Sequence, residues 1–109
     1  MAKKINFEYN GTDYVLEFTR ETVVTMEHQG FNLDDIDSKP MTIIPKLFAG
    51  SFMANHKHTS KKLIDEIYSH IPNKQELILR LAEMYREPIE AMIDDNEGEE
   101  GNVKWGTSW

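Results

Sequence analysis

Histidine and carboxylate side chains are the residues of this sequence that could support chemistry, and His56 and His58 form the most suggestive pair. An H-x-H pair on an extended segment can chelate a transition metal. However, no cysteine or carboxylate lies nearby in the sequence as a third ligand, and the intervening Lys57 disfavours a cation. We therefore interpret the pair as part of a solvated polar loop and expect no metal site.

Clustered acidic residues do not form a catalytic or calcium-binding motif either. Asp34, Asp35 and Asp37 lack the glycine and the terminal glutamate that a calcium-binding loop requires at fixed positions. Adjacent carboxylates such as Asp65 and Glu66 do not face one another on a helix. The sequence also has no glycine-rich phosphate loop and no serine nucleophile elbow. We therefore expect no catalytic residue, no cofactor and no enzymatic activity.

The composition indicates a small acidic domain, and because no chemical site is found in the sequence, we expect it to bind other proteins. The chain has 109 residues, no cysteine and a formal net charge of −7. A chain of this length has room for one domain with one core. The negative charge disfavours nucleic acid as a partner, and no apolar run approaches the ~20 residues of a membrane helix. Because the lack of cysteine suits a reducing compartment, we expect a cytoplasmic protein.

Alternating apolar residues predict a β-hairpin in residues 5–18. Its apolar face consists of Ile5, Phe7, Tyr9, Tyr14, Leu16 and Phe18. A two-residue loop at Asn10 and Gly11 would pair Glu8 with Asp13, which is a repulsive cross-strand contact. We therefore favour a four-residue loop, which pairs Tyr9 with Tyr14. Because an isolated hairpin is only marginally stable, helices must cover its apolar face.

Two helices are expected in the first half of the chain after the hairpin. The first has Thr19 as its N-cap and runs through His28, with Gly30 as a left-handed stop. Residues 32–39 are polar and are interpreted as a connection. The second and central helix is capped by Thr42, so that Pro45 falls in its first turn, and it continues to about residue 54.

Two further helices follow, which gives about four in total. The third is capped by Thr59 or Ser60 and ends before Pro72. The fourth begins with a capping box of Asn73 and Glu76, and Pro88 is expected to kink or end it. Its predicted core stripe consists of Leu77, Ile78, Leu81, Met84, Tyr85, Ile89 and Met92. The sequence thus predicts an α+β domain in residues 1–93, a two-stranded antiparallel hairpin packed by these helices.

The last part of the chain, residues 94–109, is acidic and is predicted to be a flexible tail. Both tryptophans of the chain, Trp105 and Trp109, lie in it, with Val103 nearby. Tryptophan is enriched at the energetic centres of protein interfaces. We therefore interpret these three residues as a motif that binds a partner. The alternative that this segment returns to its own domain as an extra strand or cap stays open.

Several segments together resemble a family of small phage and prophage proteins of Gram-positive bacteria. They are INFEYNG at 5–11, LFAGSF at 47–52, LIDEIY at 63–68, PNKQEL at 72–77 and NVKW at 102–105. The resemblance covers nearly the whole chain. Members of this family look like the tail assembly chaperones of long-tailed phages, which keep the tape-measure protein soluble and help tail-tube subunits to polymerise around it.

The resemblance implies a chaperone-like adaptor in the cytoplasm of the host cell. Its expected partner is the phage tape-measure protein, with the tail-tube protein as a second candidate, and self-association stays open. Two alternatives remain at this point: a structural tail or head-tail connector component, and a small host-directed inhibitory binding protein. The resemblance provides no binding residues, so the motif of Val103, Trp105 and Trp109 rests on the sequence alone.

Overall fold

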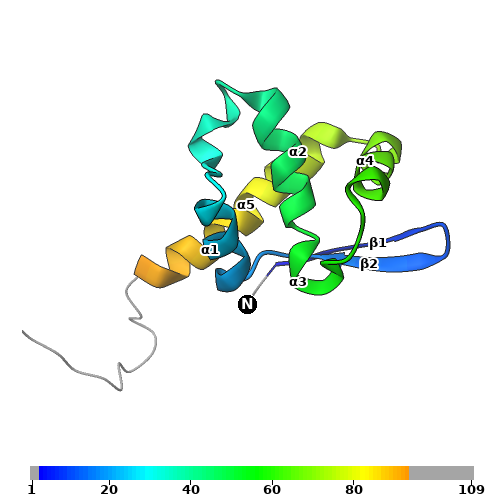
Figure 1. Ribbon diagram of the computed structural model, residues 1–109, viewed down its shortest axis with the longest axis horizontal. Coiled ribbons are helices and arrows are strands. Elements are labelled where there is room, and N and C mark those ends of the chain that lie inside the picture. Colours follow the sequence, from blue (N-terminus) through cyan, green and yellow to red (C-terminus); the bar gives the residue numbers. More distant parts are fainter. Residues whose placement is uncertain (1–2, 94–109) are drawn as a thin grey trace, which may run out of the picture.

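The protein is an α+β domain in which a hairpin lies against a layer of helices, as Figure 1 shows. A computed structural model describes residues 3–93. Its elements are β1 (Ile5–Tyr9), β2 (Thr12–Leu16), α1 (Arg20–His28), the 3-10 helix η1 (Leu33–Ile36), α2 (Pro40–Gly50), α3 (Met53–His56), α4 (Lys61–His70) and α5 (Lys74–Ile93). The predicted fold class is therefore confirmed, whereas the predicted flexible tail lies outside the described residues.

The hairpin has a two-residue loop, so the four-residue loop that we favoured is wrong. Tyr9 faces Thr12 across the strands, which leaves only Asn10 and Gly11 between them. Both loop residues have positive φ, 51° and 81°, as a tight hairpin turn of the favoured twist requires. Glu8 does face Asp13. Because both of these side chains are exposed to solvent, their repulsion is weaker than the preference of the Asn-Gly turn.

Helix α1 has the predicted boundaries. The Thr19 hydroxyl oxygen accepts a hydrogen bond from the Thr22 N–H at 3.1 Å, which caps the helix. At the other end Gly30 has a φ of 88°, and the N–H of Phe31 donates to the Met26 carbonyl at 3.0 Å. The glycine therefore stops the helix and returns the chain toward the core.

The next segment is more helical than the sequence suggested. Residues 32–39, interpreted as a connection, contain η1, which the Asn32 side chain caps by accepting from the Asp34 N–H. Helix α2 then begins at Pro40 rather than after Thr42, because proline at the first position has a suitable φ and needs no N–H partner. Pro45 therefore lies inside the helix and not in its first turn.

The predicted central helix is divided into α2 and α3. The Ser51 carbonyl accepts a hydrogen bond from the Glu17 N–H at 3.1 Å, and Ser51 is fully buried. This bond ties the helix break to the chain just after β2. The division therefore depends on a contact between distant parts of the sequence, which local helical spacing does not reveal.

Helices α4 and α5 follow the expected order but differ in detail. The Ser60 hydroxyl oxygen accepts from the Leu63 N–H and caps α4. Asn73 has a φ of 55°, unlike the extended residue that opens a capping box, and Glu76 pairs with Arg80 at 2.7 Å. Within residues 3–93 no capping-box bond forms at this site. Helix α5 continues through Pro88 to Ile93, so the predicted early end does not occur.

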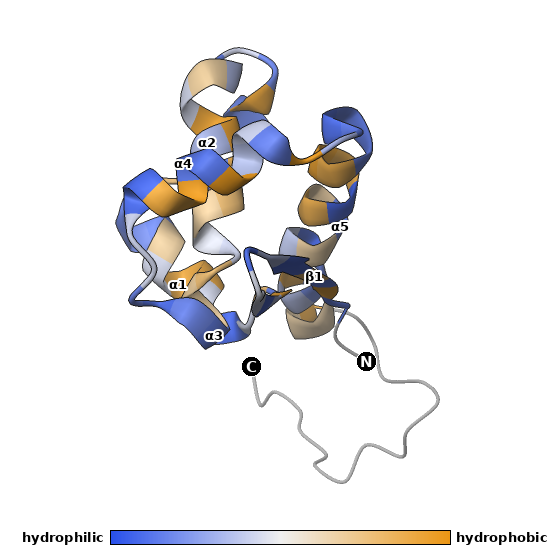
Figure 2. Cartoon of the chain, turned by 90° about the vertical axis from the view of Figure 1, so that its right-hand side faces the viewer, coloured by the Kyte–Doolittle hydropathy of each residue, from blue (hydrophilic) through white to orange (hydrophobic). Residues whose placement is uncertain are grey.

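The core lies where the hairpin, α1, α2, α4 and α5 meet, and Figure 2 shows apolar segments on the helices in orange. Its most deeply buried large residues are Leu16, Met26, Leu47, Phe48, Phe52, Ile67 and Leu81. Aromatic contacts join distant elements, since Tyr14 of β2 contacts Phe52 at a ring distance of 5.8 Å and Phe18 contacts Tyr85 at 5.3 Å. Among the described helices, none has the length and apolar character needed to span a membrane.

Candidate protein-binding surface

An apolar groove lies between α1 and the last turns of α5. We call it the α1/α5 groove, and it has a volume of about 230 Å³. Its lining residues are Arg20, Val23, Val24, Glu27, Pro88, Ile89, Met92 and Ile93. The groove forms because α5 is 20 residues long and extends past the core, whereas α1 has nine residues.

The groove residues are unusually exposed for large apolar side chains. The exposed fractions are 42% for Val24, 38% for Ile89, 60% for Met92 and 76% for Ile93. Contiguous exposed apolar residues rimmed by polar ones often mark a protein-binding site. Helical spacing in the sequence placed Ile89 and Met92 in the core stripe of the fourth helix, and the structure corrects this. Up to Tyr85 the stripe is buried except for the half-buried Ile78, and beyond Tyr85 it is exposed.

Charged side chains border the groove on the α1 side. The Arg20 guanidinium lies 3.0 Å from the Met92 sulfur, so it connects the two helices across the groove. Glu27 lies two turns further along the same helix. An apolar floor with a polar rim is the usual arrangement of a protein interface.

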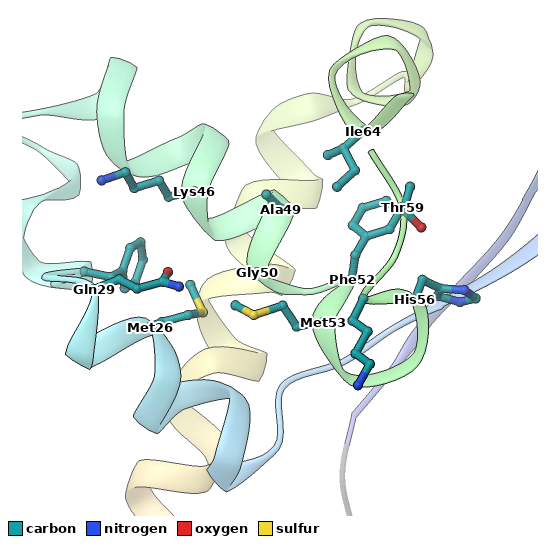
Figure 3. Close-up of a pocket in the computed structure, with 12 residues that line it drawn as sticks. Met26, Gln29, Lys46, Ala49, Gly50, Phe52, Met53, His56, Thr59 and Ile64 are labelled. Carbon is teal, nitrogen blue, oxygen red and sulfur yellow. The ribbon is translucent and has the colours of Figure 1, made fainter. Parts of the chain in front are cut away.

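A second hollow, of about 270 Å³, lies between the ends of α1, α2 and α3 (Figure 3). Gly50 contributes to it, and a Cβ at this position would come within 2.5 Å of the Met26 side chain. The absence of a side chain at Gly50 therefore leaves room for the Met26 side chain of α1. Gln29 and Lys46 are the polar groups on its α1 and α2 sides. We assign no chemistry to this hollow.

The two histidines singled out in the sequence have different environments. His56 is half-buried, and its Nε2 accepts a hydrogen bond from the Val15 N–H at 2.9 Å. His58 is exposed. His56 is thus a structural residue, and its interpretation as part of a solvated loop is wrong. In residues 3–93 no three histidine or acidic side chains gather closely enough to hold a metal ion.

Two tyrosines, Tyr9 and Tyr85, have raised pKa values. The Tyr9 hydroxyl donates a hydrogen bond to the Glu66 carboxylate at 2.5 Å, and this bond to an anion raises the pKa of Tyr9. Burial in the core raises the pKa of Tyr85. Both effects favour the neutral phenol, whereas a nucleophilic tyrosine has to be activated toward the phenolate. These tyrosines are therefore better explained as structural residues than as catalytic ones.

Comparison with known proteins identifies the family of the chain. The family model described as "Domain of unknown function (DUF5055)" matches residues 1–109. The chain belongs to the DUF5055 family. No curated protein and no solved structure matches it.

The sequence of this DUF5055 chain also predicted a partner-binding motif near its end. Val103, Trp105 and Trp109, interpreted above as a partner-binding motif, lie outside the described residues. The described part of the chain ends at Ile93, which lines the groove itself. Sequence reasoning missed the groove because helical spacing predicts which residues share a face but not how far the neighbouring helix extends along that face.

Proposed function

We propose that this DUF5055 protein is a phage tail assembly chaperone that binds the tape-measure protein. The resemblance of its sequence segments to that family motivates the proposal. The observation that supports it in the structure is the α1/α5 groove, where Val24, Met92 and Ile93 are exposed at a helix pair. A chaperone needs such a surface, because its clients expose apolar residues before assembly.

The mechanism that fits this groove is the reversible covering of an apolar helical face. An amphipathic helix of the partner would place its apolar anchors against Val24, Ile89 and Met92, as in other helix-in-groove complexes. The net charge of −7 would keep the complex soluble while that face is covered. In this proposal the protein acts in the host cytoplasm without a cofactor and is not an enzyme. The tail-tube protein is a second partner for the same surface.

Co-expression with the tape-measure protein tests the proposal. The chain should raise the soluble fraction of that protein and be captured with it. The double substitution Val24→Ser and Met92→Ser should weaken capture by about tenfold or more, because each anchor contributes on the order of 1 kcal/mol. The matched control is Met41→Ser with Leu79→Ser, which removes exposed apolar residues, 89% and 63% exposed, outside the groove.

The same experiment separates the proposal from its rivals. If both double variants capture the tape-measure protein equally well, the groove does not bind it. Purified phage particles should lack the protein, since a chaperone leaves before the tail is mature. Its stoichiometric presence in particles would instead identify a structural tail or connector component. Capture from host lysate, but not by the tape-measure protein, would favour the host-directed inhibitor.

A further inference from the structure

The outer edge of β1 carries backbone groups that have no partner in the described part of the chain. Since Tyr9 faces Thr12 next to a two-residue loop, Tyr9, Phe7 and Ile5 exchange hydrogen bonds with β2. The N–H and C=O groups of the alternate residues, Asn6 and Glu8, therefore point away from β2. No hydrogen bond to these groups is found within residues 3–93.

The outer edge of β2, in contrast, is covered by the α2–α3 region. The Val15 N–H donates to His56, and its carbonyl accepts from the Asn55 side-chain amide at 3.1 Å. The next outward group, the Glu17 N–H, donates to the Ser51 carbonyl. These side-chain and backbone bonds take the place of a third strand at Val15 and Glu17. Within residues 3–93, the outer edge of β1 has no such bonds and is the edge more open to another strand.

The charges along β1 are complementary to a second copy of the same strand. We propose that β1 pairs antiparallel with β1 of a second copy, centred on Asn6, to form a four-stranded sheet across a twofold axis. In this register Lys4 lies opposite Glu8 of the partner subunit, and Glu8 lies opposite the partner's Lys4. On the other face Ile5 lies opposite the partner's Phe7, so that half-buried apolar residues meet.

This register also compensates an unfavourable feature of the single chain. Glu8 and Asp13 are exposed acidic residues that face one another across the hairpin. The partner's Lys4 would lie on the other side of Glu8 and offset that repulsion. Sliding the partner strand by two residues in either direction puts an uncharged residue opposite Glu8. Charge complementarity therefore favours one register over its neighbours.

Charge substitutions test the pairing in the full-length chain. Wild-type protein should reach twice the mass of 12.7 kDa in sedimentation equilibrium as its concentration rises. Glu8→Lys alone, and Lys4→Glu alone, should each raise the dissociation constant about tenfold or more, because both cross-strand pairs become like-charged. An equimolar mixture of the two variants should recover the dimer, because each chain then offers the charges that the other lacks.

The Glu8→Lys variant is a suitable probe because the substitution should not destabilise the fold. The substitution replaces the Glu8–Asp13 repulsion within the hairpin by an attraction. Lys4→Glu costs more, because it replaces a 3.9 Å ion pair with Glu17, in which Lys4 is half exposed, by a like-charged contact. A mixture that stays monomeric, or single variants that dimerise as tightly as the wild type, would overturn the proposed register.

Amide hydrogen exchange distinguishes a second copy from the chain's own C-terminal segment. With a second copy, protection of the Asn6 and Glu8 amides should rise with protein concentration and persist after truncation at Ile93. Protection that does not depend on concentration and disappears on truncation would mean that residues 94–109 occupy the edge. Unprotected amides at every concentration would mean that no strand pairs with β1. Either of these two outcomes rejects the dimer.

Discussion

His56 shows how a residue that suggests metal chemistry can instead complete a sheet edge. Its imidazole accepts the Val15 N–H, and the neighbouring Asn55 donates to the carbonyl of the same residue. The sequence shows an H-x-H pattern but cannot show that a strand lies within reach of its first member. What distinguishes His56 from His58 is a contact with a residue 41 positions away.

Substitution of His56 should destabilise the domain without any metal being involved. His56→Ala leaves the half-buried Val15 N–H without its partner, which should cost about 1 to 3 kcal/mol of unfolding free energy. His58→Ala is the matched control and should change stability little, because His58 is exposed. Denaturant melts of both variants measure the difference, and adding zinc or a chelator should not shift either midpoint. Equal stability of the two variants would contradict the role given to His56.

The core phenol of Tyr85 predicts a loss of stability at alkaline pH. Burial raises the pKa of Tyr85 in the folded protein above that in the unfolded chain. As the pH rises past about 10, the unfolded chain therefore releases the proton first, and the free energy of unfolding falls. Tyr85→Phe should make this alkaline decline less steep, as measured by denaturant melts at several pH values. An unchanged pH profile in this variant would show that Tyr85 titrates normally.

At the scale of elements, local signals predicted the starts of α1 and α4 but not how the elements meet. The hydroxyls of Thr19 and Ser60 cap α1 and α4 as expected, because capping depends on only a few consecutive residues. The hairpin register was predicted wrongly because the repulsion between Glu8 and Asp13 was judged to be stronger than the preference of Asn10 and Gly11 for a two-residue turn. The break between α2 and α3 depends on a long-range backbone bond, and no local pattern encodes it.

The groove was missed for a related reason. Ile89 and Met92 continue the apolar stripe of α5, and helical spacing alone assigns them to the core. Whether they are buried depends on how many residues of α1 lie opposite them. Pro88 was the only feature of the sequence that could indicate a change in burial along this stripe. It is the first residue of α5 that lines the groove.

The apolar face of the hairpin should be essential to the core. Leu16 of β2 is fully buried, so Leu16→Ala should cost about 2 to 5 kcal/mol, which is a large share of the stability of so small a domain. Leu79→Ala, at a position 63% exposed on α5, is the control and should cost far less. Thermal and denaturant melts compare the two. A Leu16→Ala midpoint close to that of the wild type would mean that the hairpin contributes little to the core.

At the scale of the whole molecule, the described residues already form a closed core. The buried cluster extends from Tyr14 to Tyr85, and it draws on the hairpin and on α1, α2, α4 and α5. The large apolar residues that remain exposed at the end of α5 line the groove. If the groove binds the partner as proposed, folding and partner binding depend on largely different residues, with Val23 common to both.

Truncation after Ile93 tests this separation. The truncated chain keeps every residue of the core cluster, so its circular dichroism and melting midpoint should stay close to those of the full chain. It loses Val103, Trp105 and Trp109, the residues interpreted as a partner-binding motif. Capture of the tape-measure protein should weaken, since a docked tryptophan can contribute about 2 kcal/mol or more.

A full-length variant with Trp105→Ala and Trp109→Ala separates the effect of the tryptophans from that of the acidic residues before them, because it keeps those acidic residues. If the tryptophans bind the partner, this variant should lose as much capture as the truncation while melting like the wild type. A truncation that melts much earlier would mean that the segment stabilises its own domain. Capture that survives both changes but is lost with Val24→Ser and Met92→Ser would assign partner binding to the α1/α5 groove alone.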